Sequence, residues 1–226
     1  MPPTQCAVCH GWSRERLCAA CRERFNSAGP RCTRCALRVP DGVSVCGACL
    51  KDPPPCDSAL AAMDYAHPWD QLIARFKFNA ALDLADSLAQ SLAHAWRESG
   101  LPAPGWLLPV PLSDERLKER GYNQSWELAR RLARHVGAPA DGRLLLRIKN
   151  TPHQLAFPVD RRAANVRGAF AVEPVRAGEL RGRSVTIVDD VLTTGATASE
   201  IARVLKQAGA SQVHLWALAR TPAPTD

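Results

Sequence analysis

The sequence predicts an α/β domain with a parallel sheet, preceded by a small cysteine-rich module that binds zinc. Two observations lead to this prediction. All nine cysteines of the 226-residue chain lie in its first 56 residues, and apolar segments of strand length alternate with amphipathic helical segments after them. A chain of this length accommodates one full-sized domain and one small module. We therefore expect the module over 1–56 and the α/β domain over 57–226, with Pro53-Pro54-Pro55 as a stiff spacer at the boundary.

Eight of the cysteines form four Cys-x-x-Cys pairs, which predict two metal sites. The pairs are Cys6/Cys9, Cys18/Cys21, Cys32/Cys35 and Cys46/Cys49. A two-residue spacer lets one tight turn aim two sulfurs at one ion, and two such turns complete the closed tetrahedral S₄ site of structural zinc. A module of this size cannot bury enough apolar surface to fold alone, so metal binding would supply its folding free energy.

Other uses of the cysteines fit the sequence less well. A disulfide framework requires an oxidising compartment, and the chain does not open on a basic segment followed by an apolar run, as an export signal would. A redox dithiol needs a single pair, and iron–sulfur clusters have a different spacing. The pairs could combine sequentially or interleaved, and shorter loops favour the sequential arrangement. Cys56 stands alone and is given no function.

The formal net charge is +7, and the basic excess is densest in the module, where residues 1–56 hold eight basic and four acidic residues. Such density is typical of proteins that bind phosphates or nucleic acid. Arginines on a solvated surface that neutralise nearby thiolates explain it equally well. No segment is apolar for long enough to span a bilayer. We therefore expect a cytoplasmic protein without membrane insertion.

Each element of the second part is predicted from its local pattern. Short apolar runs predict strands, and apolar residues near helical spacing, such as Leu84, Leu88 and Leu92, predict helices. Strands are expected over 58–65, 106–110, 144–148, 169–172, 185–188 and 213–219. Helices are expected over 68–77, 80–96, 123–136 and 196–208. The polar segments 111–122 and 151–165 are expected to be loops. The alternation predicts a parallel sheet covered on both faces.

The strongest signal for function is the 13-residue run over 185–197, an apolar strand followed by two acids, a short loop and a helix. Its polar and small members are Asp189, Asp190, Thr193, Thr194, Gly195, Ala196 and Thr197. Ligands bind beyond the carboxyl ends of strands in open parallel sheets, and the unpaired N–H groups at a helix start suit phosphate. Carboxylates accept hydrogen bonds from vicinal diols, so the run suits a ribose 5-phosphate. A capped helix with an acid at its dipole would account for one acid and one hydroxyl only.

This run resembles the phosphoribosyl pyrophosphate signature of type I phosphoribosyltransferases. The resemblance implies a parallel-sheet domain of type I phosphoribosyltransferase-like fold. It implies that Asp189 and Asp190 are the catalytic acids and hold the ribose 2′- and 3′-hydroxyls. It also implies that the loop over 193–197 holds the 5′-phosphate, and that Mg²⁺ is bound mainly through substrate oxygens.

Flanking motifs extend the resemblance to the ComF family over nearly the whole chain. They are Leu108-Pro109-Val110-Pro111-Leu112, Arg120-Gly121-Tyr122-Asn123-Gln124, Gln154, Arg162, Asn165, Gly168-Ala169-Phe170 and the four cysteine pairs, which match the double zinc ribbon of the family. With this match, we expect Arg116, Lys118 and Arg120 to contact the pyrophosphate; a solvated basic loop is the alternative. Arg161, Arg162 and Asn165 would belong to a loop that closes over the ligand or is simply exposed. The segment Phe76-Lys77-Phe78-Asn79 departs from the family pattern by lacking a glycine after the lysine.

Two function hypotheses follow. The first is an enzyme that binds phosphoribosyl pyrophosphate or ribose 5-phosphate with Mg²⁺ and transfers the ribose phosphate to an acceptor that the sequence does not identify. The second, implied by the association of the ComF family with DNA uptake, is a non-catalytic or regulatory protein that binds single-stranded DNA. Trp12 and Phe25 would stack on bases there, although a role in the small core of the module is the preferred interpretation. The sequence leaves a homo-oligomer open.

Overall fold

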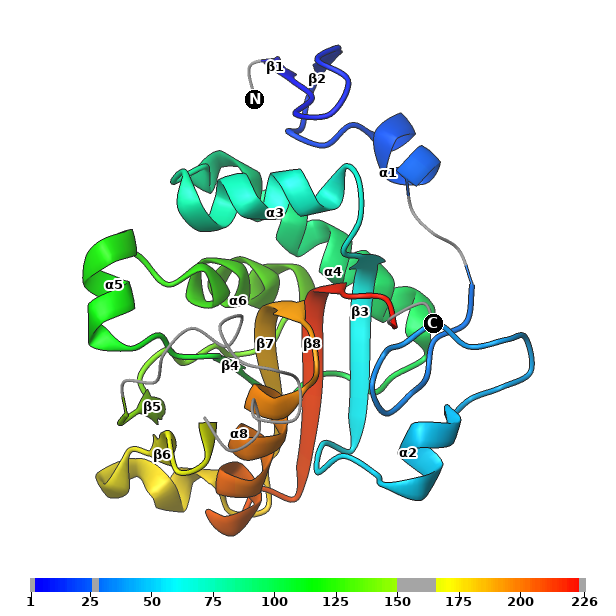
Figure 1. Cartoon of the computed structure of the whole chain (residues 1–226). Coiled ribbons are helices and arrows are strands. Elements are labelled where there is room, and N and C mark those ends of the chain that lie inside the picture. The colour runs from blue at the N-terminus through cyan, green and yellow to red at the C-terminus, as the bar shows by residue number, and fades with distance from the viewer. Residues whose placement is uncertain (1–2, 26–28, 150–165, 224–226) are drawn as a thin grey trace.

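The computed structural model describes residues 3–25, 29–149 and 166–223 of the chain. Its centre is a four-stranded parallel sheet with the order β3-β8-β7-β4 (Figure 1). The strands are β3 (Ser58–Asp64), β4 (Trp106–Pro109), β7 (Ser184–Leu192) and β8 (Gln212–Arg220). The sheet register places Leu108 opposite Ile187, and Ile187 opposite Leu215. The predicted parallel sheet is confirmed.

Helices cover both faces of the sheet, as the pattern of alternation predicts. One face packs against α3 (Trp69–Phe78), η1 (Leu82–Leu84), α4 (Ala85–Ser99) and α6 (Gln124–Val136). The other face packs against η3 (Pro174–Leu180) and α8 (Ala196–Gln207). Because neighbouring side chains of a strand point to opposite faces, Trp216 and Leu218 of β8 join the first core while Leu215 and Ala217 join the second.

The segment 111–122, expected to be a polar loop, contains the helix α5 (Asp114–Arg120), so that expectation is wrong. The segment lacks the apolar periodicity of a core helix, yet its ends favour a helix. Ser113 occupies the N-cap position without a side-chain capping hydrogen bond, Asp114 begins an acidic first turn, and Gly121 ends the helix in the left-handed conformation with a φ of 80°. Such end signals stabilise a short surface helix without a buried stripe.

Two further expectations about strands need correction. The segments around 144–148 and 169–172 form β5 (Leu145–Arg147) and β6 (Phe170–Val172), which pair antiparallel in a separate sheet and do not join the main one. The strand expected to end at Val188 continues to Leu192, because β8 pairs with it throughout. Gln154, Arg161, Arg162 and Asn165, for which the resemblance raised expectations, lie outside the described residues.

The cysteine-rich module consists of short elements that dock on the two faces of the sheet separately. The elements are β1 (Thr4–Gln5), β2 (Trp12–Ser13), α1 (Ala19–Phe25) and α2 (Gly47–Lys51). Ala7 and Leu17 of the first half are buried in the core formed with α3 and α4. Ala36 of the second half is buried in the core formed with α8. Figure 1 shows the first half above α3 and the second half beside β3.

Residues 3–25, 29–149 and 166–223 include no helix that combines the length and the apolar character needed to cross a bilayer.

Candidate functional site

The eight paired cysteines converge in two clusters whose geometry fits zinc. The first cluster contains Cys6, Cys9, Cys18 and Cys21, and the second contains Cys32, Cys35, Cys46 and Cys49; within each, all four sulfurs lie within 4.8 Å of one another. Tetrahedral zinc with Zn–S bonds of about 2.3 Å separates its sulfurs by about 3.8 Å. The Cys9–Cys18 and Cys35–Cys46 sulfur distances are 3.8 and 3.7 Å. The sequential pairing is therefore confirmed.

Backbone amides favour the thiolates of Cys6 and Cys32, whereas burial and neighbouring sulfurs raise the pKa of Cys21 and Cys49. Burial raises the pKa of the Cys6 thiol, but N–H groups from Cys18, Cys9 and Val8 outweigh it and lower this pKa to about 6. The Cys46 N–H likewise donates to the Cys32 sulfur at 3.3 Å. All four ligand positions of each cluster are sulfurs, which is the donor set of a closed structural site.

The two predicted acids lie side by side at the carboxyl end of β7, beyond the point where its neighbour β4 stops. Pairing with β4 ends at Val188, so the edge of β7 at Asp189 and Asp190 is not covered by that strand. The Asp189 Oδ1 atom accepts a hydrogen bond from the Ser125 hydroxyl at 3.2 Å. The Asp190 carboxylate, only 3% exposed, forms an ion pair with Lys77, with Nζ 2.8 Å from Oδ2.

The two carboxylates differ in their protonation. Burial and the negative charge of Asp190 raise the pKa of Asp189 to about 7. Burial also disfavours the charge of Asp190, but Lys77 outweighs it and holds the pKa of Asp190 below its ordinary value. The pair therefore carries one charge that is fixed by Lys77 and one that changes near neutral pH.

The side chain of Asn123 positions Ser125 beside Asp189. Its Oδ1 atom caps α6 by accepting from the backbone N–H groups of Ser125 at 2.9 Å and Trp126 at 3.2 Å. Its Nδ2 atom donates to the Val110 carbonyl at 3.0 Å, directly after β4. One side chain thus attaches the start of α6 to the end of the neighbouring strand.

The loop over 193–197 connects the acids to α8. Gly195 is the N-cap of α8 and has a φ of 81°, a left-handed conformation that glycine adopts without strain. A side chain at this position would meet only Leu192, at 3.8 Å, so the inner side of the turn is not crowded. Thr194 is exposed, and Thr193, Ala196 and Thr197 are partly exposed. The loop thus combines the start of a 12-residue helix with three hydroxyl side chains.

The structure separates the three predicted pyrophosphate ligands. Arg120 lies at the end of α5, with its guanidinium 5.1 Å from the centre of the Phe78 ring, and its charge interacts with that of Asp190. Arg116 is half-buried one turn earlier on the same side of α5. Lys118 is exposed on the opposite side of the helix. Arg120 is therefore brought to the acids, whereas Lys118 is not.

Comparisons with known proteins match both parts of the chain. Residues 123–226 match the family model described as "Phosphoribosyl transferase domain", and residues 1–50 match "Double zinc ribbon domain". A "DNA utilization protein YhgH" of Shigella flexneri is 35% identical over 210 residues, covering 91% of this chain and 90% of that protein. "Competence protein F" of Haemophilus influenzae is 33% identical, covering 96% of both chains.

The chain belongs to the ComF family. This ComF-family protein combines a double zinc ribbon with a phosphoribosyltransferase domain. Among solved structures, a glutamine phosphoribosylpyrophosphate amidotransferase of Bacillus subtilis is similar at 19% identity and a TM-score of 0.39, covering 64% of this chain and 30% of that chain.

No local sequence pattern predicts a role for Lys77 or Ser125 of the ComF-family protein. Lys77 was noted only as part of a departing motif, although it follows Ile73 by four residues and thus belongs to the buried side of α3. A lysine on a buried helix face needs an anionic partner, which is the signal that could have identified it. Ser125 is fully buried at the start of α6, and no local sequence pattern marks it as a partner of Asp189.

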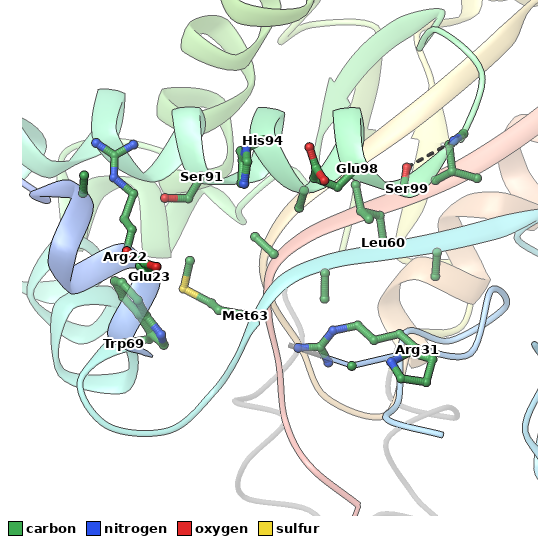
Figure 2. Close-up of a pocket in the computed structure, with 18 of the residues that line it drawn as sticks. Arg22, Glu23, Arg31, Leu60, Met63, Trp69, Ser91, His94, Glu98 and Ser99 are labelled. Carbon is green, nitrogen blue, oxygen red and sulfur yellow. Dashed lines mark hydrogen bonds between the residues drawn. The ribbon is translucent and has the colours of Figure 1, made fainter. Parts of the chain in front are cut away.

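A cavity in the described part of the ComF-family protein lies away from the acids. It has a volume of about 1120 Å³ and is bordered by both halves of the zinc module, the β3 edge and α4 (Figure 2). Two of its arginines already have partners: Arg22 donates to the Leu17 carbonyl, and Arg31 forms an ion pair with Asp64 at 2.7 Å. Neither acid lines this cavity, so its size does not identify it as the ribose phosphate site.

Most arginines of the zinc module make structural contacts with carboxylates or backbone carbonyls, which neither explanation of the basic excess predicted. The contacts of Arg16, Arg22, Arg31, Arg34 and Arg38 involve carboxylates or backbone carbonyls. Arg14 and Arg24 are exposed. Trp12 is 76% exposed, so the preferred core role of this residue is wrong, whereas Phe25 packs against the core as expected.

The two clusters should lose their zinc independently. We expect Cys9→Ser to reduce the zinc content from two ions per chain to one, and Cys46→Ser to remove the other ion, because each cluster is complete without the other. Metal analysis by plasma mass spectrometry of the purified full-length proteins measures this. Loss of both ions from the Cys9→Ser variant would contradict independent sites.

Removal of the Lys77 charge should raise the pKa of both acids. In Lys77→Met the buried carboxylates lose their cation, so we expect the pKa of Asp189 to rise from about 7 by roughly 1 to 3 pH units. Carbon-13 NMR titration of the aspartate carboxyl groups measures this rise, with Arg203→Met on α8 as the control. An unchanged titration would mean that Lys77 does not neutralise the pair.

Proposed function

We propose that the protein binds phosphoribosyl pyrophosphate with Mg²⁺ at the carboxyl end of β7 and transfers its ribose phosphate to an acceptor. The observation that carries the proposal is the position of Asp189 and Asp190 near the end of β7, beyond its last pairing with β4 and shortly before the turn into α8. In ribose 5-phosphate the diol needs hydrogen-bond acceptors and the phosphate needs donors. The acids and the turn that follows them along the chain offer these groups in that order.

In this proposal each group of the site has a separate task. The carboxylates accept hydrogen bonds from the ribose 2′- and 3′-hydroxyls, and the amides and hydroxyls over 193–197 hold the 5′-phosphate. Arg120, with Arg116 one turn earlier on the same side of α5, faces the pyrophosphate, whereas Lys118 on the opposite side of the helix does not. Bound Mg²⁺ would neutralise the charge of the pyrophosphate and would be held mainly by oxygens of the substrate. Asp189 and Asp190 offer further carboxylate oxygens of the kind that Mg²⁺ prefers.

The transfer breaks the bond between ribose C1 and the pyrophosphate oxygen and forms a bond between C1 and the acceptor, which loses its proton. Positive charge develops on the ribose, so catalysis depends on positioning and on anionic groups near the ring. Asp190 provides a fixed negative charge there because Lys77 keeps it ionised. Arg120 stabilises the departing pyrophosphate.

Substitution of either acid should weaken ribose 5-phosphate binding. We expect Asp189→Asn and Asp190→Asn to lower affinity by roughly 10- to 150-fold, because each loses a charged hydrogen bond of about 1.5–3 kcal/mol. Calorimetry with ribose 5-phosphate and MgCl₂ measures the affinity, with Asp41→Asn in the exposed turn of the module as a matched control. Absence of binding by the unsubstituted protein would overturn the proposal. Pyrophosphate release with a panel of acceptors tests the transfer.

The same titration should depend on pH through Asp189. Above a pKa of about 7 this carboxylate accepts from the diol, and below it the acid is protonated and loses that capacity. Affinity should therefore fall as the pH decreases from 8 to 6. The second pKa of the sugar phosphate, about 6, changes the charge of the ligand and therefore affects the affinity of every variant alike. The fall should be shallower in Asp189→Asn, and equal slopes would argue against a role of Asp189 in binding the diol.

Single-stranded DNA is a second candidate ligand, supported by a separate observation. Relatives are named "DNA utilization protein" and "Competence protein F", and Trp12 projects from the first ribbon at 76% exposure, two residues before the exposed Arg14. An exposed indole beside a cation is typical of surfaces on which bases stack. This interaction would not require the acids of β7.

Truncation of Trp12 should weaken DNA binding specifically. Stacking of one base contributes about 1–3 kcal/mol, so we expect Trp12→Ala to lower the affinity for oligothymidine by roughly 5- to 150-fold. Leu50→Ala is the control, since Leu50 is an apolar residue of the second ribbon with 71% exposure. Fluorescence anisotropy at fixed ionic strength measures both variants. Equal affinities for the two variants would exclude Trp12 as the stacking residue.

A further inference from the structure

Arg220 connects the second zinc cluster to the loop that follows β7. It is the last residue of β8 and is only 7% exposed. Its Nε atom donates to the Cys35 carbonyl at 3.0 Å, and one terminal nitrogen donates to the carbonyls of Leu192 at 3.0 Å and Thr221 at 2.8 Å. Cys35 is a ligand of the second cluster, and Leu192 directly precedes the loop over 193–197.

The second cluster also supplies the negative charge for this buried guanidinium. Among the described residues, Arg220 has no carboxylate within ion-pair distance, and its hydrogen-bond acceptors are carbonyl groups. The anions that act on it are the sulfurs of Cys35, Cys46 and Cys49. Zinc with four thiolates carries a net charge of −2, and a buried cation needs such a partner.

Further contacts attach the same half of the module to the loop region. The Cys56 thiol lies 3.8 Å from the Ala198 carbonyl in the first turn of α8, and the fully buried Ala36 packs in the core that contains Ala198. The Thr221 N–H donates to the Leu192 carbonyl at 3.0 Å. The first cluster has a different environment, because Ala7 and Leu17 pack with α3 and α4 on the opposite face.

We propose that Arg220 is a positioning residue through which the second zinc site orders the loop over 193–197. The cluster fixes the Cys35 carbonyl and the counter-charge, Arg220 fixes the Leu192 carbonyl, and the loop starts from Leu192. The consequence for ligand affinity rests on the function proposed above, whereas the order of the loop does not. Within the described part of the chain, the first zinc site has no such connection to the loop.

Hydrogen exchange of the full-length, zinc-loaded protein tests this coupling. We expect Arg220→Met to keep two zinc ions yet to speed exchange of the amides over 193–197 about tenfold, the equivalent of one lost hydrogen bond of about 1.4 kcal/mol. Exchange in α4, on the opposite face, should stay unchanged. Arg203→Met, an exposed arginine of α8, is the control and should leave the loop unchanged. Unchanged loop exchange in Arg220→Met would overturn the proposal.

Removing one zinc ion at a time shows which of the two clusters orders the loop. We expect Cys46→Ser to speed exchange over 193–197, and Cys9→Ser not to do so. Cys46→Ser should add nothing to the loop exchange of Arg220→Met, because both act through one connection. If Cys46→Ser speeds loop exchange equally in the unsubstituted protein and in Arg220→Met, the cluster acts on the loop without Arg220, which contradicts the proposal. Should Arg220→Met not fold, Arg220→Lys, which keeps the charge but cannot span the carbonyls, replaces it with the same expected outcomes.

Ligand affinity provides a separate result. If the unsubstituted protein binds ribose 5-phosphate, Arg220→Met should weaken binding about tenfold, and unchanged affinity would contradict the positioning role. If the unsubstituted protein does not bind ribose 5-phosphate, the proposed function fails, while the exchange of the loop still decides the coupling.

Discussion

The ion pair between Lys77 and Asp190 is the interaction on which the site depends. A parallel sheet places the end of β7 between layers of helices, where two adjacent carboxylates could not both remain charged without a cation. Lys77 reaches this point because α3 ends beside it, and Ser125 of α6 contacts the other acid. The two helices thereby hold the pair of acids at the end of β7, beyond the last residue that pairs with β4.

The zinc module is integrated with the domain unequally. Its first half rests on α3 and α4, the helices of the face that also provides Lys77. Its second half contributes Ala36 to the opposite core and reaches the end of β8 through Arg220. Metal binding therefore stabilises surfaces on both faces of the sheet. The second half of the module adjoins the proposed phosphate loop.

Features that depend on neighbouring residues in the sequence could be predicted. The Cys-x-x-Cys pairs predicted two metal sites, and the preference for short loops favoured the pairing that the structure shows. The run around Asp189 was sufficient for a strand, a turn and a helix. The partners of the acids were not predictable, because Lys77 and Ser125 are brought to them by tertiary packing. The helix α5 was missed because it is stabilised by its ends, which an apolar period does not reveal.

A crystal of the full-length protein soaked with ribose 5-phosphate and MgCl₂ provides the most direct test of the site. The account predicts density for the sugar at the end of β7, with its hydroxyls within hydrogen-bond distance of Asp189 and Asp190 and its phosphate against the amides over 193–197. Density for the sugar phosphate elsewhere, with this turn empty at saturating ligand, would contradict the account.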